Sequence, residues 1–168
     1  MPSFAHVVGH TPGALDGLLA EVAARLTAEG ASLAGVVQSN TATADDTRCD
    51  MNLTVLGRGE VVRISQRLGA GATGCRLDPQ GLEQAVGLVE ASMPGAGLLI
   101  VNKFGKAEIE GRGFRPLIGR ALAQGSAVLV GMNADNVAAF AGFHAGLSQR
   151  LPGEVSALLA WCRARITA

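Results

Sequence analysis

Alternating apolar and polar stretches predict a strand, a helix and a second strand within the first 38 residues. An apolar run at 4–8 precedes a turn containing glycine and proline, and leucines and valines then recur at helical spacing to about residue 29. Gly30 is suited to end that helix, and "SLAGVVQ" (32–38) has the pattern of a second buried strand. This order predicts a parallel pair of strands joined by a right-handed crossover.

The segment after the second strand changes character twice. "SNTATADDTRCD" (39–50) is polar and rich in small turn-forming residues, so we expect an exposed loop there, suited to act as a lid. "MNLTVL" (51–56) and "EVVRIS" (60–65) then alternate apolar with polar residues on either side of a short glycine turn, which predicts a β-hairpin. The hairpin would add antiparallel strands to a mainly parallel sheet.

The second half of the chain continues the alternation of helices and strands. Asp78 and Pro79 are suited to begin a helix that ends at 93–95. The later elements are expected to be a strand at 97–101, a helix at 116–124, a strand at 127–131, a short helix from 135, a glycine-rich turn near 142–146 and a helix at 152–165. We therefore expect a single domain over residues 1–168, with a three-layer α/β fold and helices on both faces of the sheet.

Composition narrows the possible partners. The 14 basic and 14 acidic residues balance and aromatic residues make up 4% of the chain, so nothing indicates a nucleic-acid partner. No apolar run is long enough to cross a bilayer and no signal-peptide pattern is present, so we expect a cytoplasmic protein without a membrane partner. Three widely spaced cysteines indicate free thiols, and three histidines lack metal-ligand spacing, so no metal site is predicted.

Three polar loops follow the predicted strands, and the ligands of such sheets bind beyond the carboxyl ends of the strands. In the first loop, Gly9, His10 and Gly13 precede a helix whose N-terminus would accept an anion through backbone amides, although a plain turn explains the same residues. This loop is not a standard phosphate-binding loop, because Ala14 and Leu15 occupy the positions of the required Lys and Ser/Thr.

The third loop, "NKFGKAEIEGRGFR" (102–115), contains both lysines of the chain, whereas the other twelve basic residues are arginines. Lysine is a flexible point charge suited to phosphate, and a loop with cations and glycines can hold an oxyanion by charge-assisted hydrogen bonds. We expect the site to be formed by Asn102, Lys103, Gly105, Lys106, Arg112 and Arg115. A solvated basic turn, with pairs such as Lys106 with Glu110, is the alternative.

A glycine-rich segment, "GAGATGCRLDP" (69–79), has the glycine spacing of a dinucleotide-binding fingerprint, but it follows polar residues instead of a buried strand, which excludes that assignment. Cys75 is a candidate reactive thiol, because a neighbouring cation such as Arg76 would lower the pKa of the thiol. A structural cysteine, with Arg76 paired to Asp78, explains the same residues.

Three motifs carry a resemblance to a known family. "GVVQ" (35–38), "GCRLDP" (74–79) and above all "VNKFGKAEIEGRGFR" (101–115) are similar to a bacterial family of uncharacterised, nucleoside-triphosphatase-like proteins often associated with molybdenum uptake genes. The resemblance spans nearly the whole chain and implies the fold of P-loop nucleoside triphosphatases. The association with molybdenum implies molybdate or a pterin nucleotide as a class of ligand.

The same loop departs from P-loop hydrolases in a consistent way. "LLIVNKFGKAE" (98–108) resembles the strand that carries Asp-Glu, then Gly-Lys, then a further acid in those enzymes, and Gly105, Lys106 and Glu108 match this frame. Asn102 and Lys103 stand where the Asp that supports magnesium and the Glu that activates water are expected. The resemblance therefore implies a binding edge on a hydrolase-like scaffold, without efficient hydrolysis.

Three functions remain open on these observations. The first is binding of a nucleotide, phosphate or a molybdate-like oxyanion, with Lys103 in place of the missing phosphate-loop lysine. The second is a nucleoside triphosphatase or phosphotransferase with rearranged machinery, in which Asp45, Asp46 or Glu108 serves a metal ion or water. The third is an accessory module whose basic loop docks on a protein partner. All three share one fold, and no residue pattern identifies a cofactor.

Overall fold

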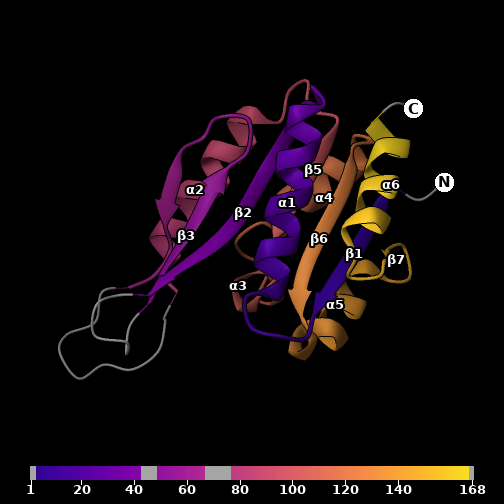
Figure 1. Ribbon diagram of the computed structural model, residues 1–168. Helices are drawn as coiled ribbons and strands as arrows, with labels where there is room; N and C mark the ends of the chain where they lie inside the picture. The colour runs from indigo at the N-terminus through magenta and orange to yellow at the C-terminus, as the bar shows by residue number, and fades with distance from the viewer. Residues whose placement is uncertain (1–2, 43–48, 67–76, 167–168) are drawn as a thin grey trace.

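In a computed structural model of the protein, which describes residues 3–42, 49–66 and 77–166, the strands join in one sheet (Figure 1). The strands are β1 (Phe4–Gly9), β2 (Leu33–Ala42), β3 (Cys49–Val55), β4 (Val61–Arg63), β5 (Leu98–Asn102), β6 (Ala127–Asn133) and β7 (Gln149–Arg150). Their order across the sheet is β4-β3-β2-β5-β6-β1-β7.

The direction of the strands divides the sheet into two parts. β2, β5, β6, β1 and β7 run parallel, whereas β3 pairs antiparallel with β2 and with β4. This arrangement confirms the mainly parallel sheet with a hairpin excursion. β1 lies between β6 and β7, so the order of the strands reverses there, and ligands of such sheets bind at the carboxyl ends of the strands around a reversal.

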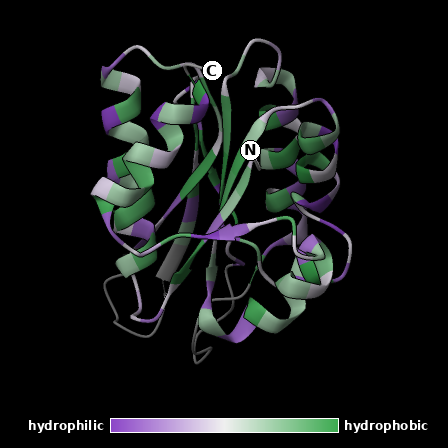
Figure 2. Cartoon of the chain, turned by 90° about the vertical axis from the view of Figure 1, so that its right-hand side faces the viewer, coloured by the Kyte–Doolittle hydropathy of each residue, from purple (hydrophilic) through white to green (hydrophobic). Residues whose placement is uncertain are grey.

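Helices cover both faces of the sheet. They are α1 (Ala14–Ala28), α2 (Pro79–Ser92), α3 (Lys106–Ile109), α4 (Arg115–Ala123), α5 (Val137–His144) and α6 (Val155–Ile166), with a 3₁₀ turn at Ala134–Asn136. α1 and α6 share one buried cluster with the sheet, while α2 and α4 share the other. Figure 2 shows the hydrophobic strands between these two helical layers, which confirms the three-layer α/β fold.

Alternate residues of the central strand β5 pack into the two different hydrophobic clusters. Leu98 and Ile100 belong to the cluster under α1 and α6, whereas Leu99 and Val101 belong to the cluster under α2 and α4. Both faces of a parallel strand are covered in such folds, so the strand reads as a continuous apolar run. Asn102 continues the alternation toward α1 and is completely buried.

The ends of two helices agree with their sequence signals. Asp78 Oδ1 accepts a hydrogen bond from the backbone N–H of Gln80 (3.1 Å), and Pro79 occupies the first helical position of α2. α1 ends at Ala28, and Gly30 follows it with a φ of +85°, where glycine is favoured because it lacks a Cβ.

One prediction about local structure was wrong in part, and one strand was missed. The polar segment expected as a loop at 39–50 is partly strand, because Thr41 pairs with Asp50 and Ala42 with Cys49 in the β2–β3 ladder. β7 was not predicted, since Gln149 and Arg150 are exposed and pair only through their backbone with β1. Ladder hydrogen bonds join backbone groups, so polar strand ends leave little signal in the hydrophobic pattern.

Four candidate residues, Asp45, Asp46, Cys75 and Arg76, lie outside the described residues. Cys162 of α6 is a free, buried thiol, and its burial raises the pKa of the thiol to about 12. Among the helices in the described ranges, none is long and apolar enough to cross a membrane.

Candidate functional site

The loop that follows β5 is folded around the carboxylate of Glu108. This side chain is 3% exposed, and its two oxygens accept hydrogen bonds from the backbone N–H groups of Gly105 (2.9 Å) and Phe114 (3.0 Å). Burial raises the pKa of the Glu108 carboxyl, while these hydrogen bonds act in the opposite direction. Glu108 therefore organises the loop that presents Lys103 and Lys106.

Asp16 connects this loop to the first turn of α1. Its Oδ1 accepts a hydrogen bond from Asn102 Nδ2 (3.1 Å) and lies 3.5 Å from Lys103 Nζ. The first and third polar loops therefore meet at the carboxyl edge of the sheet, through a residue that the sequence analysis missed. The sequence does contain a signal that Asp16 is buried. Asp16, Leu19, Ala23 and Leu26 follow one another at intervals of three, four and three residues, so Asp16 continues the buried stripe of α1.

A cavity of about 290 Å³ opens beside the same loop. We call it the lysine cavity, because both lysines of the chain line it. Its polar lining consists of Gln38, Asn102, Lys103, Lys106, Glu108 and Asn133, with Gly105 beside them. These residues come from β2, the end of β5 and the loop after it, α3 and the end of β6, so the cavity lies at the edge where a ligand is expected.

The predicted residues of the first loop lie in a different hollow. Gly9 and His10 line a second cavity of about 430 Å³ together with Thr11 and Arg150, between the start of α1 and the segment after β7. Gly13 is the N-cap of α1, with a φ of +79°, and is outside the lining of both cavities. Lys103 and His10 therefore share one edge of the sheet but line separate cavities.

The two predicted arginines also lie outside the lining of the lysine cavity. Arg112 forms an ion pair with Glu110. The alternative of a solvated basic turn had instead paired Glu110 with Lys106. Arg115 places its guanidinium over the ring of Phe143, 5.1 Å from the ring centroid. The two arginines therefore contact Glu110 and Phe143, and neither residue lines the lysine cavity.

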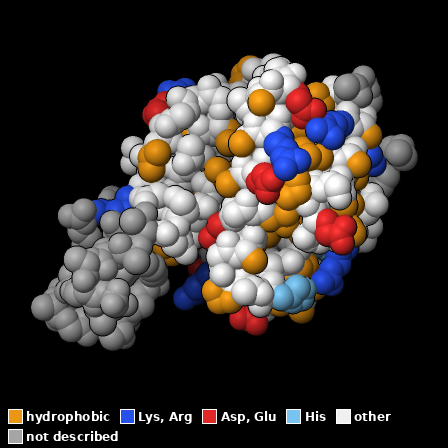
Figure 3. Space-filling model, in the orientation of Figure 1, with side chains coloured by type: hydrophobic (Ala, Val, Ile, Leu, Met, Phe, Trp, Pro, Cys, Tyr) orange, Lys and Arg blue, Asp and Glu red, His pale blue; other side chains and the backbone are white. Residues whose placement is uncertain are grey.

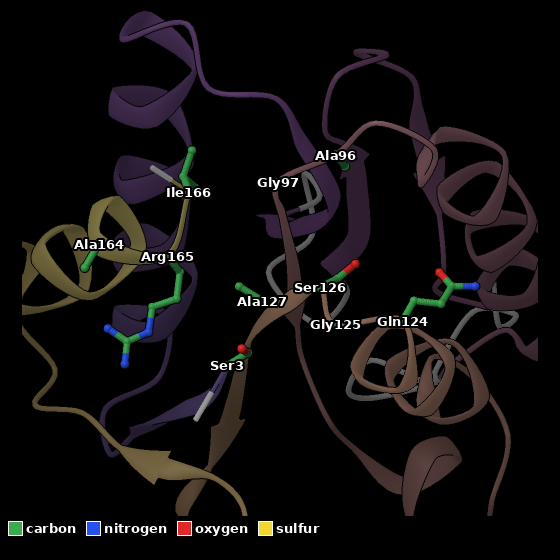
Figure 4. A pocket seen from close by; sticks show the side chains of 10 residues that line it. All are labelled: Ser3, Ala96, Gly97, Gln124, Gly125, Ser126, Ala127, Ala164, Arg165 and Ile166. Atoms are coloured by element: carbon green, nitrogen blue, oxygen red, sulfur yellow. The ribbon is translucent and has the colours of Figure 1, made fainter. Parts of the chain in front are cut away.

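A larger cavity, of about 560 Å³, lies at the opposite edge of the sheet (Figure 4). Ser3, Gly97 and Ser126, which line it, precede β1, β5 and β6, so it lies at the amino ends of the strands.

Figure 3 shows acidic and basic side chains interspersed over the face of the molecule around α1, without a broad patch of one sign. The lysine cavity remains the best candidate, because it combines the expected edge with locally grouped cations.

Comparisons with known proteins agree with this architecture. The solution structure of a human cancer-related nucleoside triphosphatase aligns with a TM-score of 0.63, covering 88% of this chain and 86% of that chain at 15% sequence identity. The similarity shows a shared fold and confirms the expected nucleoside-triphosphatase-like fold.

One curated relative and one family model match the sequence of the chain. Over 150 residues, which are 89% of this chain, it is 35% identical to "Molybdenum import ATP-binding protein ModC 2" of Bradyrhizobium diazoefficiens. The chain spans only 17% of the length of that relative. The family described as "Protein of unknown function (DUF2478)" matches residues 4–161, and the chain therefore belongs to this family.

Proposed function

We propose that this protein binds a phosphate-bearing ligand or another oxyanion in the lysine cavity, without efficient hydrolysis. The observation that carries the proposal is the placement of Lys103 and Lys106, the two lysines of the chain, on one cavity at the carboxyl edge of the sheet. The ammonium group of a lysine has three rotatable donors on a flexible stem, so it can direct hydrogen bonds to the oxygens of a tetrahedral anion. Hydrogen bonds between charged partners are also stronger than those between neutral groups.

The charges around the cavity support an anion that binds between the two lysines. Lys103 is held in place by Asp16, and its side chain remains 22% exposed, so an incoming anion can reach it. Lys106 is exposed at the start of α3. The Glu108 carboxylate also lines the cavity, but its two oxygens already accept backbone N–H groups, which offsets its repulsion of an anion.

The groups at the end of β5 support binding more than hydrolysis. Phosphoryl transfer needs a metal ion and a positioned water molecule, which acids usually hold. Asn102 occupies the strand end with a neutral amide that is bonded to Asp16, and Glu108 is committed to the backbone of its own loop. A hydrolase built on this edge would need Glu108 to leave these partners, or other acids such as Asp45 and Asp46.

The comparisons suggest which anions to test. The fold shared with a nucleoside triphosphatase supports nucleotides, and the name of the bacterial relative supports molybdate and its analogue tungstate. Phosphate is the simplest member of the same chemical class. Each is a proposal for this chain, because the relative is much longer than the part that matches.

A thermal-shift titration tests the proposal. The ligands are phosphate, molybdate, tungstate and nucleoside triphosphates, with and without magnesium, and the proteins are the wild type, Lys103→Met and Arg25→Ala. Lys103→Met keeps most of the aliphatic stem and removes the charge, whereas Arg25→Ala removes a cation from an exposed ion pair with Glu21 on α1. A ligand present at a hundredfold excess over its Kd stabilises the folded state by about 2.7 kcal/mol.

We expect at least one anion to raise the Tm of the wild type and of Arg25→Ala, and to leave Lys103→Met unchanged. An equal shift in all three proteins would place the anion elsewhere, and no shift with any anion would overturn the proposal. Phosphate release is measured on the same samples. Magnesium-dependent turnover that is lost in Asp45→Ala, Asp46→Ala or Glu108→Ala would favour the hydrolase instead.

A further inference from the structure

We infer that the ligand of the lysine cavity is a small organic anion, with an apolar ring or chain joined to its anionic group, and not a bare oxyanion. This inference rests on the proposed function and specifies its ligand. The anionic group lies at Lys103 and Lys106, and the apolar part occupies the cavity between the β3–β4 hairpin and α2.

The walls of the cavity carry the inference. In addition to the polar groups named above, the cavity is lined by large hydrophobic side chains, which are Met51, Leu53, Ile64, Leu77, Leu82 and Phe114. These side chains come from β3, the end of the hairpin, α2 and the start of α4, and all of them belong to or pack against one hydrophobic cluster. The cavity is therefore a cationic mouth that opens onto the edge of the apolar core.

The size of the cavity points in the same direction. Its volume of about 290 Å³ is close to the lower limit of roughly 300 Å³ for sites that bind small molecules, and about ten times the ~30 Å³ of one water molecule. Most of the hydrophobic lining is already buried, and the open apolar walls are formed mainly by the half-buried Met51 and Leu77, which a bare oxyanion held by the lysines would leave uncovered. Covering those walls with carbon removes apolar surface from water and adds affinity that a bare oxyanion cannot gain.

The polar groups fit an anion better than a neutral apolar ligand. The ion pair with Asp16 holds the ammonium group of Lys103 beside the cavity. The buried Glu108 carboxylate fixes the backbone of the loop that carries Lys106. A neutral hydrocarbon would leave both ammonium groups to be hydrated at the mouth. Charge and shape are therefore complementary to one molecule that carries both kinds of surface.

Four probes separate the two parts of the ligand. Phenyl phosphate carries an apolar ring, methyl phosphate carries almost none, ribose 5-phosphate carries a polar ring, and benzyl alcohol has the apolar ring without the anion. Affinities are measured by titration calorimetry on the wild type, Met51→Trp and Met93→Trp. Met51 lines the lysine cavity, so tryptophan fills it, whereas Met93 lines a cavity near the end of α2 and supplies the matched change. The Tm of each variant reports whether it is folded.

We expect the wild type and Met93→Trp to bind phenyl phosphate at least about tenfold more tightly than methyl phosphate or ribose 5-phosphate. Met51→Trp should remove this preference, with methyl phosphate bound as in the wild type. Equal affinities for the three phosphates would overturn the inference and leave the proposed function standing. Binding of benzyl alcohol without binding of any phosphate would overturn the anion site itself, and binding of none of the probes would overturn both.

Discussion

At the scale of single residues, the loop after β5 depends on close contact between one carboxylate and one glycine. Gly113 has a φ of +60°, and a Cβ built on it would lie 1.8 Å from Glu108 Oε2. Its own N–H donates to Glu83 Oε1 of α2 (3.0 Å), which ties the loop to that helix. The absence of a side chain at Gly113 is therefore what allows the Glu108 carboxylate to approach the backbone of the loop.

Gly113→Ala should destabilise the fold by about 2–4 kcal/mol, because the new Cβ adds overpacking against Glu108 to the cost of the positive φ. Gly111→Ala is the matched control. Gly111 also has a positive φ, +91°, but a Cβ there would have nothing within 4 Å, so only a backbone cost of about 1 kcal/mol is expected. Urea unfolding of both variants measures the difference, and equal losses would show that the contact with Glu108 is unimportant.

The buried side chain of His6 should make the stability of the fold depend on pH. The side chain is 6% exposed on β1, its Nδ1 lies 2.7 Å from Ser148 Oγ, and its ring stacks on His144. Burial, followed by the nearby charges of His144 and Arg150, lowers the pKa of His6 from 6.5 to about 4. Between these values the unfolded chain binds a proton at His6 that the folded chain does not, so stability falls as the pH falls.

The expected loss from this group is ~3 kcal/mol between neutral pH and about pH 4. His6→Gln removes the titration while keeping a polar side chain near Ser148. The free energy of unfolding of the variant should therefore change less with pH than that of the wild type over this range. Parallel curves for the two proteins would contradict the assignment of this pH dependence to His6.

At the scale of elements, the hydrophobic pattern predicted helices and strands wherever burial is regular. The stripe of α1, the cap of α2 and the apolar run of β5 are all readable from side chains. β7 and the outer ends of β2 and β3 are held by backbone pairing, and α3 has four residues, so these elements give no periodic signal. Asp16 was missed as a site residue for a related reason, since its role depends on α1 packing beside the end of β5.

The contact between α1 and β5 controls the charge available at the lysine cavity. Asp16→Asn removes a negative charge 3.5 Å from Lys103 Nζ and keeps an oxygen that can accept from Asn102 Nδ2. Anion affinity should rise between about threefold and tenfold, because no carboxylate then offsets the positive charge of Lys103. Glu21→Gln, in an exposed ion pair on the same helix, should leave the affinity unchanged. A lower affinity in Asp16→Asn would show that Asp16 helps to bind the ligand instead of competing with it.

At the scale of the whole molecule, the order of the strands assembles the site. β2, β5 and β6 are neighbours in the sheet although α2, α3, α4 and the hairpin separate them in the chain. The resemblance to nucleoside triphosphatases implied this fold and drew attention to the loop after β5. The apolar walls of the lysine cavity could not be predicted, because Met51, Leu77 and Phe114 come together only when the hairpin and α2 pack beside that loop.

The position of a bound oxyanion shows directly whether the lysine cavity is the binding site. Crystals of the protein are soaked in tungstate, and anomalous scattering locates the tungsten atoms in the wild type and in Lys103→Met. We expect a peak in the lysine cavity, within hydrogen-bonding reach of Lys103 and Lys106, that is lost in the variant. A peak only in the cavity lined by His10 and Arg150, or an unchanged peak in Lys103→Met, would contradict it.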